Sequence, residues 1–270
     1  MFYKKIGFIG AGKMGGAIIK GLISSGFIAK ESIFVSEPNK EIAKYTEETL
    51  EIKVFHNNKQ LADSSDIIVL AVKPFMIKTV LEEIKEYLTD KKLIISIAAG
   101  ITTSFIQEIA GNIPVIRVMP NTPALVSEGM SAICRGKFAS DEQIEDAEKI
   151  FSKVGKCIEV TENLIDVVTG ISGSGPAFAY TIMEALADGG VKLGLPKSTA
   201  LILAAQTMLG SAKMVLETGK HPSILKDEVT TPGGCTAEGL AVLEDNNIRS
   251  VLIKTVEKTA KKAFELGNKK

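Results

Sequence analysis

The 270-residue chain is poor in the residues that carry redox, metal and charge-driven chemistry. It contains no tryptophan, two histidines and three cysteines, and its 32 basic residues are balanced by 32 acidic ones. Three scattered cysteines give neither a disulfide framework nor a zinc site, so we expect reduced thiols and a cytoplasmic location. His56 and His221 have no carboxylate or cysteine at ligand spacing, so no metal is expected. The balanced charge removes the electrostatic case for nucleic acid or an anionic membrane, and we expect a small-molecule partner.

Long hydrophobic runs are also scarce. The longest charge-free apolar stretches, such as residues 198–212, contain Ser, Thr and Gln and are too short to cross a bilayer, and no signal peptide precedes the first predicted strand. We therefore expect a soluble protein with no membrane partner. Hydrophobic residues make up 45% of the chain and aromatics only 6%, which is typical of buried parallel strands and close-packed helices. Two domains are expected, because 270 residues exceed the size of most single cores.

A glycine-rich turn lies near the start of the chain. Residues 6–9 form a short apolar strand pattern, the sequence GAGKMG follows at 10–15, and a helix pattern continues from there. In this context Gly10 makes the tight turn, Gly12 lets a pyrophosphate approach the backbone, and Gly15 lets the helix pack on the strand. The spacing predicts a dinucleotide-binding domain of the Rossmann type.

Strand and helix patterns alternate through the first 160 residues. Further strands are predicted at 32–36, 66–72, 92–97, 115–119, 129–135 and 157–160, and helices at 40–50, 77–88, 103–109 and 141–154. This alternation predicts an α/β fold with a doubly wound, mainly parallel sheet and a cofactor beyond the carboxyl ends of the strands. We assign residues 1–162 to this domain.

Strand patterns end near residue 164, and we assign residues 163–270 to a second, all-α domain. Helices are predicted at 164–193, 197–217, 236–244 and 250–266. The helix at 197–217 is apolar on more than one face, which a small domain cannot easily bury alone. We interpret it as a subunit interface; the alternative is a central core helix of a monomer.

The segment 225–244 places a Pro-Gly-Gly turn at the mouth of a helix. Gly233 and Gly234 allow the backbone to turn, and Thr236 takes the expected position of an N-cap. Free backbone N–H groups and the positive end of the helix dipole suit a small anion. The alternative is an ordinary capped surface helix.

Longer motifs span nearly the whole chain. They are GFIGAGKMGGAI near the start, LAVKP at 70–74, ISIAAGI at 95–101, RVMPNTPALV at 117–126, SGSGPAFAY at 172–180, ADGGVKLGLP at 187–196 and KDEVTTPGGCTAEGL near the end. In these motifs the chain closely resembles the pyrroline-5-carboxylate reductase family, which makes proline in the last step of its biosynthesis. The resemblance implies a Rossmann domain plus a helical dimerisation domain interleaved between two subunits, with dimers often assembled into larger rings.

The resemblance also implies a reaction and its residues. Family members reduce the cyclic imine 1-pyrroline-5-carboxylate by moving a hydride from a reduced nicotinamide to the imine carbon. A protonated imine is already electrophilic, so positioning does most of the work and no His-Asp or Lys-Asn dyad is needed. By resemblance, the hydroxyl of Thr236 holds the ring nitrogen and the backbone of 229–236 receives the substrate carboxylate. The implied substrate-binding residues are Val229, Thr230, Thr231, Gly233, Gly234, Cys235 and Thr236.

The cofactor implied by the resemblance is NADPH or NADH. Its implied binding residues are Gly10, Gly12, Lys13, Met14, Gly15, Ser36, Glu37, Asn58, Ala71, Val72, Lys73, Pro74, Ala98, Ala99, Gly100 and Asn121. The chain departs from the family at Glu37, where many relatives that resemble it carry Ser. A carboxylate there accepts both ribose hydroxyls of NADH but repels the 2′-phosphate of NADPH. Because Ser36, Asn39, Lys40 and Asn58 would bind that phosphate if Glu37 turned away, the choice stays open, with NADH slightly favoured.

Two other functions compete with this one. Another reductase or a β-hydroxyacid-type dehydrogenase would share a Rossmann domain followed by helices, but that dehydrogenase class needs a Lys with an Asn one helical turn later. Residues 170–184 carry Ser172, Ser174 and a Gly-Pro pair instead, with no Lys. A non-catalytic dinucleotide sensor is the second alternative, and the intact TTPGGCT segment argues against it.

Overall fold

The computed structural model describes residues 2–267, which divide into two compact units. Unit 1 runs to Ser174 and resumes at Lys258, and unit 2 is the segment Gly175–Glu257. These units are defined by compactness alone, whereas the boundary after residue 162 predicted from the sequence also separates functions. That boundary stays a prediction.

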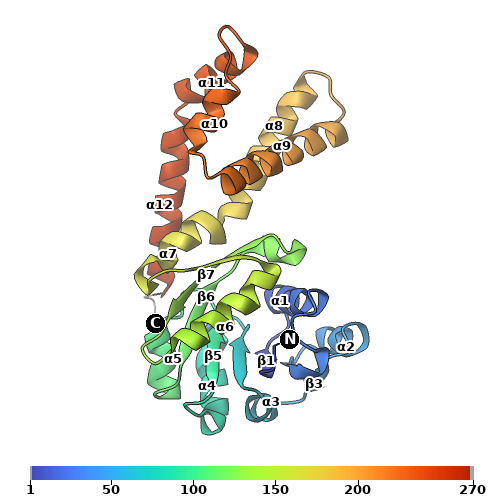
Figure 1. The fold of residues 1–270 in the computed structure, drawn as a ribbon, viewed down its shortest axis with the longest axis vertical. Coiled ribbons are helices and arrows are strands. Elements are labelled where there is room, and N and C mark those ends of the chain that lie inside the picture. Colours follow the sequence, from blue (N-terminus) through green and yellow to red (C-terminus); the bar gives the residue numbers. More distant parts are fainter. Residues whose placement is uncertain (1, 268–270) are drawn as a thin grey trace. The chain divides into compact units, whose positions relative to one another are not determined.

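Unit 1 is built on one eight-stranded sheet with the order β3-β2-β1-β4-β5-β6-β7-β8 (Figure 1). The strands are β1 (Ile6–Ile9), β2 (Ile33–Ser36), β3 (Lys53–Phe55), β4 (Ile67–Leu70), β5 (Leu93–Ser96), β6 (Val115–Met119), β7 (Gly129–Arg135) and β8 (Gly155–Glu159). Neighbouring strands are parallel except β6 and β7, which are antiparallel. The predicted doubly wound, mainly parallel sheet is confirmed. Its order reverses between β1 and β4, which is where such sheets bind ligands.

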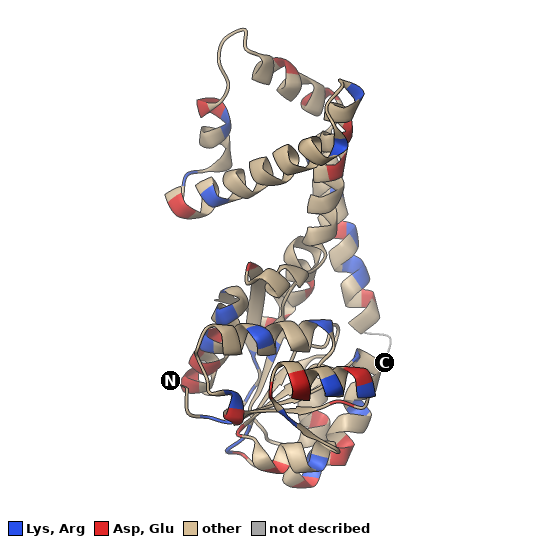
Figure 2. Ribbon diagram, turned by 90° about the vertical axis from the view of Figure 1, so that its right-hand side faces the viewer, with Lys and Arg blue, Asp and Glu red and all other residues tan. Residues whose placement is uncertain are grey.

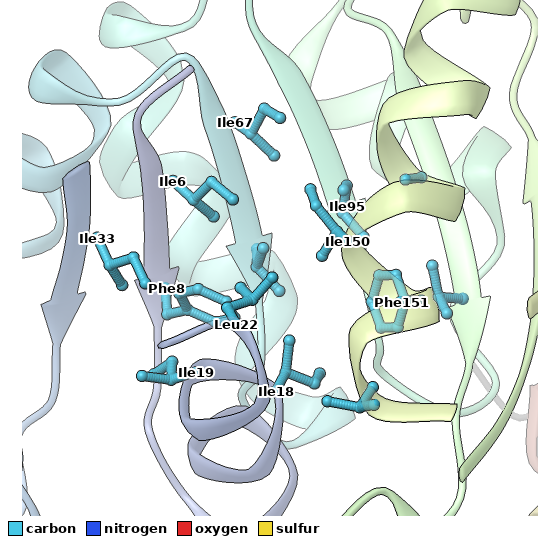
Figure 3. Packing of buried hydrophobic residues seen from close by; sticks show 14 of the residues in the cluster. Ile6, Phe8, Ile18, Ile19, Leu22, Ile33, Ile67, Ile95, Ile150 and Phe151 are labelled. Atoms are coloured by element: carbon cyan, nitrogen blue, oxygen red, sulfur yellow. The ribbon is translucent and has the colours of Figure 1, made fainter. Parts of the chain in front are cut away.

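Helices cover both faces of this sheet. They are α1 (Lys13–Ser24), α2 (Lys40–Thr49), α3 (Asn58–Ser64), α4 (Ile77–Ile84), α5 (Thr103–Ala110) and α6 (Asp141–Phe151). Successive strand residues face opposite sides. Phe8 of β1 therefore packs among residues of α1 and α6, such as Ile18 and Phe151 (Figure 3). Ile9, the next residue, packs in a second cluster that includes residues of α3, α4 and α5. These two apolar layers hold β1, and with it the glycine-rich turn, in place.

A buried ion cluster joins β6 to the segment that follows the sheet. Arg117 of β6 is 4% exposed, and its guanidinium lies 3.5 Å from Glu162 and 3.6 Å from Asp166. Glu162 also accepts hydrogen bonds from the backbone N–H and the hydroxyl of Thr103, both at 2.7 Å. These contacts compensate the buried charge of Arg117 and hold the segment that carries Glu162 and Asp166 against the sheet.

Three elements between β1 and residue 192 were not predicted correctly. The short strand β3 and helix α3 were not expected. The expected continuous helix 164–193 is divided into α7 (Ile165–Val168), a π-helical turn at Thr169–Gly173, and α8 (Gly175–Lys192). Asn121 fixes the π-helical turn, because its side-chain amide donates to the carbonyl of Ser172 at 3.0 Å.

Unit 2 consists of α8, α9 (Lys197–Thr218), α10 (Pro222–Glu228), α11 (Cys235–Asp245) and the first half of α12 (Ile248–Gly267). The sequence did not predict α10. Along α9 the charged residues are Lys197, Lys213 and Glu217, so this helix is almost entirely tan in Figure 2, whereas both charges are interspersed over unit 1. Only Ala200 and Ala204 of α9 are buried within the chain. Such an exposed apolar surface needs a partner.

Helix α9 contradicts the expectation that every apolar segment is too short to cross a bilayer. Among the described residues it is the one helix that is long and apolar enough to do so, by length and composition alone. The expectation from residues 198–212 was therefore wrong as a statement about length, because the helix has 22 residues.

The last turns of α12 return to unit 1. Residues from Lys258 onward belong to that unit. Gly267 lies against Gly100, which follows β5, so closely that a Cβ on Gly100 would come within 3.3 Å of the Gly267 Cα. Unit 1 is therefore assembled from both ends of the described chain.

Candidate cofactor and substrate sites

The glycine-rich turn has the geometry that a dinucleotide pyrophosphate needs. Gly10 has φ +94°, and a Cβ there would lie 2.8 Å from the carbonyl oxygen of Ala71. A Cβ on Gly15 would lie 2.7 Å from the carbonyl oxygen of Gly10, so α1 packs closely on the turn. A Cβ on Gly12 would meet nothing within 4 Å, which leaves open space beside the first N–H groups of α1. The three glycines have the positions that the fingerprint predicts.

A cavity of about 470 Å³ and a larger one of about 800 Å³ lie beside this turn. The larger cavity is lined by many of the residues that the resemblance implied for the cofactor: Gly10, Gly12, Lys13, Met14, Glu37, Ala71, Val72, Lys73, Pro74, Ala98 and Ala99. These residues follow β1, β2, β4 and β5, so the parallel strands bring them to one edge of the sheet. The open Gly12 and this lining fit an extended dinucleotide.

Glu37 is held against the glycine-rich turn. Its carboxylate accepts a hydrogen bond from the backbone N–H of Ala11 at 2.8 Å and another from that of Asn39 at 2.9 Å. Both oxygens still have lone pairs for further donors, because a carboxylate has about four acceptor positions. The side chain therefore keeps acceptor positions for a further donor where it lines the cavity.

A third cavity, of about 530 Å³, is also lined by Glu37. Ser36, which is 6% exposed, donates its hydroxyl proton to the Asn58 carbonyl oxygen at 2.8 Å. The Asn58 amide nitrogen donates to a carboxylate oxygen of Glu83 at 2.7 Å. All four side chains line this cavity. The structure thus joins β2, α3 and α4 through one chain of hydrogen bonds.

The sequence did not predict several residues that line this third cavity. His56, Phe75, Met76, Thr79 and Glu83 line it and were not predicted. The sequence contains a pattern for three of these residues: Met76, Thr79 and Glu83 are spaced by three and four residues and so share one face of a helix. Without the fold, that face could not be assigned to the cofactor.

Three residues predicted for cofactor binding line none of these three cavities. Gly15 packs on the turn, and Gly100 lies beside Gly267. Asn121 is 8% exposed; its carbonyl oxygen accepts from the backbone N–H of Met130 at 2.8 Å while its amide binds Ser172. Their contact with a cofactor stays a prediction.

In unit 2, the Pro-Gly-Gly turn leads into α11, but Thr236 is not the N-cap. The cap is Gly234, which makes no side-chain bond, and the helix begins at Cys235. Gly233 has φ +67°, and a Cβ on Gly234 would lie 2.3 Å from the Thr231 hydroxyl, so the turn requires both glycines. This turn shifts the helix start two residues toward the N-terminus, which is why the N-cap prediction was wrong.

The correction changes what the Thr236 hydroxyl is free to do. No hydrogen bond joins it to another group among the described residues. The side chain is half-buried on the first turn of α11, beside the N–H groups of Cys235 and Thr236, which have no acceptor within the helix. An N-cap threonine would use its hydroxyl within the helix, whereas this hydroxyl is left for water or a ligand.

The cysteines offer no nucleophile within unit 1. Burial raises the pKa of Cys134 to about 12, and burial does the same for Cys157. Both thiols therefore stay protonated near neutral pH, and a thiol needs its thiolate form to attack. No group of three or more His, Cys, Asp or Glu residues that could hold a metal occurs among residues 2–267.

The doubly wound sheet, the glycine-rich turn and the open cavity at its edge define an oxidoreductase of the Rossmann class. Residues 5–100 match the family model "NADP oxidoreductase coenzyme F420-dependent", and residues 162–266 match "Pyrroline-5-carboxylate reductase dimerisation". A pyrroline-5-carboxylate reductase of Methanosarcina acetivorans is 46% identical over 98% of this chain and 99% of its own. The chain belongs to the pyrroline-5-carboxylate reductase family.

Solved structures agree with this assignment. A pyrroline-5-carboxylate reductase from Coxiella burnetii superposes with a TM-score of 0.93 and 38% identity, covering 97% of this chain and 98% of that one. The Plasmodium falciparum enzyme, solved with NADP bound, gives a TM-score of 0.89 and 36% identity, covering 99% of this chain and all of that one. The fold and family expected from the motifs are confirmed.

Proposed function

We propose that this chain reduces 1-pyrroline-5-carboxylate to L-proline by hydride transfer from NADH or NADPH, the last step of proline biosynthesis. The observation that carries the proposal is an intact dinucleotide cradle in unit 1 together with an intact TTPGGCT turn in unit 2, in a chain that matches reductases of this name along nearly its whole length. A non-catalytic dinucleotide sensor would need the dinucleotide cradle but not the TTPGGCT turn.

The reaction requires little of the protein beyond positioning. The cofactor supplies the hydride, and the residues around Gly12 hold its pyrophosphate. The N–H groups at the start of α11 bind the substrate carboxylate, and the Thr236 hydroxyl orients the ring nitrogen, which already carries its proton. The hydride leaves the C4–H bond of the reduced nicotinamide, which becomes oxidised, and forms a C–H bond at the imine carbon. The C=N π electrons become a lone pair on nitrogen. No general base is needed, because the imine nitrogen already carries its proton.

The proposed substrate-binding segment therefore comprises Val229 to Thr236, with Thr236 as the catalytic residue. Support comes from the free Thr236 hydroxyl and from the left-handed turn at Gly233, both described above. The adjacent hydroxyl of Thr230 is already committed, because it donates to the carbonyl of Lys226 at 2.7 Å. Thr236 is thus the better candidate of the two for contact with a ligand.

The placement of Glu37 favours NADH. Its carboxylate already uses the N–H groups of Ala11 and Asn39, two donors that a 2′-phosphate would otherwise bind. Two ribose hydroxyls satisfy the remaining lone pairs, whereas a phosphate dianion is repelled. Lys40 is exposed and lines neither cavity, so it does not compensate.

Self-association follows from the dimerisation domain, and we further propose dimers assembled into a ring, located in the cytoplasm. The exposed apolar surface of α9 supports a subunit interface rather than a membrane span, because the helix lies inside the matched dimerisation segment. The same segment supports the functional boundary after residue 162.

The experiment is a paired assay with the purified, full-length protein. Oxidation of NADH and of NADPH is followed by absorbance with and without 1-pyrroline-5-carboxylate, and proline is identified chromatographically. We expect oxidation only with the cyclic imine and one proline per cofactor consumed. A folded sample that forms no proline with either cofactor contradicts the proposal, and oxidation of a β-hydroxyacid with NAD or NADP would favour the rival dehydrogenase.

A further inference from the structure

The hydrogen-bond chain Ser36–Asn58–Glu83 has only one possible direction. A carboxylate only accepts, so the group of Asn58 that faces Glu83 at 2.7 Å must be its NH₂. The carbonyl oxygen of Asn58 then faces Ser36, and Ser36 must donate its single hydroxyl proton to it at 2.8 Å. Glu83 thereby determines the orientation of both other side chains.

This direction removes the Ser36 hydroxyl proton from the donors that a ligand in the cavity beside Glu37 could use, because that proton binds Asn58. The other side-chain donors in the cavity lining belong to His56, Asn57, Asn58 and Thr79. Pro38, which also lines the cavity, has no N–H. A phosphate dianion needs several donors, whereas two ribose hydroxyls bring donors of their own.

The negative charges that line the cavity also disfavour a phosphate. Glu37 and Glu83 both line it, one at the end of β2 and the other on α4. Like charges next to one site disfavour a further negative group there. Lys53 and Lys59, the nearest lysines in sequence to Asn58, do not line the cavity.

We infer that Glu83 is a positioning residue for cofactor choice: through Asn58 and Ser36 it prepares the cavity for the ribose hydroxyls of NADH and against the 2′-phosphate of NADPH. This inference rests on the proposed use of a nicotinamide dinucleotide. It assigns to α4, a helix with no part in the glycine fingerprint, a share of the specificity that the sequence placed at Glu37, Ser36, Asn39, Lys40 and Asn58.

The test compares Glu83→Gln with the matched control Glu82→Gln. Both remove one negative charge from the same helix, but Glu82 points to solvent, with a side chain 58% exposed and an ion pair to Lys78 at 3.9 Å. Glutamine at 83 keeps the length of the side chain and, by turning its amide, permits Asn58 to present donors to the cavity. Binding of 5′-ADP and of 2′,5′-ADP is measured by calorimetry on the whole protein.

For Glu83→Gln we expect 2′,5′-ADP to bind about tenfold more tightly, with 5′-ADP changed less than about twofold. In the reaction, KM for NADPH should fall while kcat with either cofactor stays close to that of the parent. In an Asn58→Ala background, Glu83→Gln should lose most of its effect, because the orienting contact is absent. Glu82→Gln should change neither affinity.

The outcomes separate this inference from the proposed function. If the two nucleotide affinities shift as expected but no proline forms, the cavity assignment stands and the proposed reaction is wrong. If proline forms but Glu83→Gln leaves the ratio of affinities unchanged, or shifts it no more than Glu82→Gln does, the inference is overturned. An effect of equal size in the Asn58→Ala background would overturn the role of Asn58.

Discussion

Replacing Thr236 by valine or alanine separates a role in catalysis from a role in folding. The hydroxyl binds no group within residues 2–267 and caps no helix, so its removal costs no hydrogen bond in that part of the chain. Alanine has a helix propensity better than threonine by about 0.5 kcal/mol, and valine keeps the shape of the side chain. We therefore expect the free energy of unfolding of either variant to stay within about 1 kcal/mol of the parent.

Turnover should behave differently. A hydrogen bond that orients the reacting nitrogen contributes about 1.5–4 kcal/mol to lowering the barrier, so kcat should fall roughly ten- to a thousand-fold in both variants. Serine at this position keeps the hydroxyl and should restore most of the rate. The dissociation constant for NADH, measured by fluorescence, should change little.

The assay is steady-state NADH oxidation with the cyclic imine, in parallel with thermal unfolding. A Thr236→Val protein with nearly normal turnover would show that the hydroxyl does not engage the substrate. A loss of turnover accompanied by a large fall in stability would instead assign Thr236 a structural role, contrary to the free hydroxyl in the structure.

Three further predictions follow from other parts of the chain. Glu37→Ser should shift the ratio of kcat/KM for NADPH over NADH upward by roughly ten- to a thousand-fold, since it removes a ribose acceptor and a repulsive charge; an unchanged ratio would make Glu37 irrelevant to the choice. Leu203→Glu, on the exposed surface of α9, should bury an unpaired charge and abolish both assembly and activity, and sedimentation of an active monomer would contradict the interface. Arg117→Met should lower the free energy of unfolding in urea by about 2–3 kcal/mol, because it leaves Glu162 without its cation, whereas Arg135→Met, at an exposed pair, should cost less than about 1 kcal/mol; equal losses would refute the buried cluster.

The predictability of the fold depended on the strength of the local pattern. Strands such as 67–70 are continuous apolar runs that a parallel sheet buries on both faces, and the sequence located them to within two residues. Strand β3 has only three residues, one of them exposed, so it carries no such run. Helix α3 has one recognisable signal, the N-cap Asn57, which accepts from the N–H of Gln60.

The site was predictable where its geometry is local. Gly10 and Gly12 act within a single turn, so the fingerprint located them correctly. The hydrogen bond from Ala11 to Glu37 and the link from Asn58 to Glu83 join segments 25 or more residues apart, and no local pattern contains them. At Thr236 the local prediction failed because the left-handed Gly233 moved the helix start.

The return of α12 to unit 1 has a consequence for how the protein is made. Residues 258–267 are synthesised after every residue of unit 2, yet they complete the unit that contains the first strand. The nucleotide-binding half therefore cannot reach its final packing around Gly100 while the ribosome is still producing the helices of unit 2. We expect its last contacts to form only at the end of translation, so a nascent chain stopped before Lys258 should expose the Gly100 turn to protease.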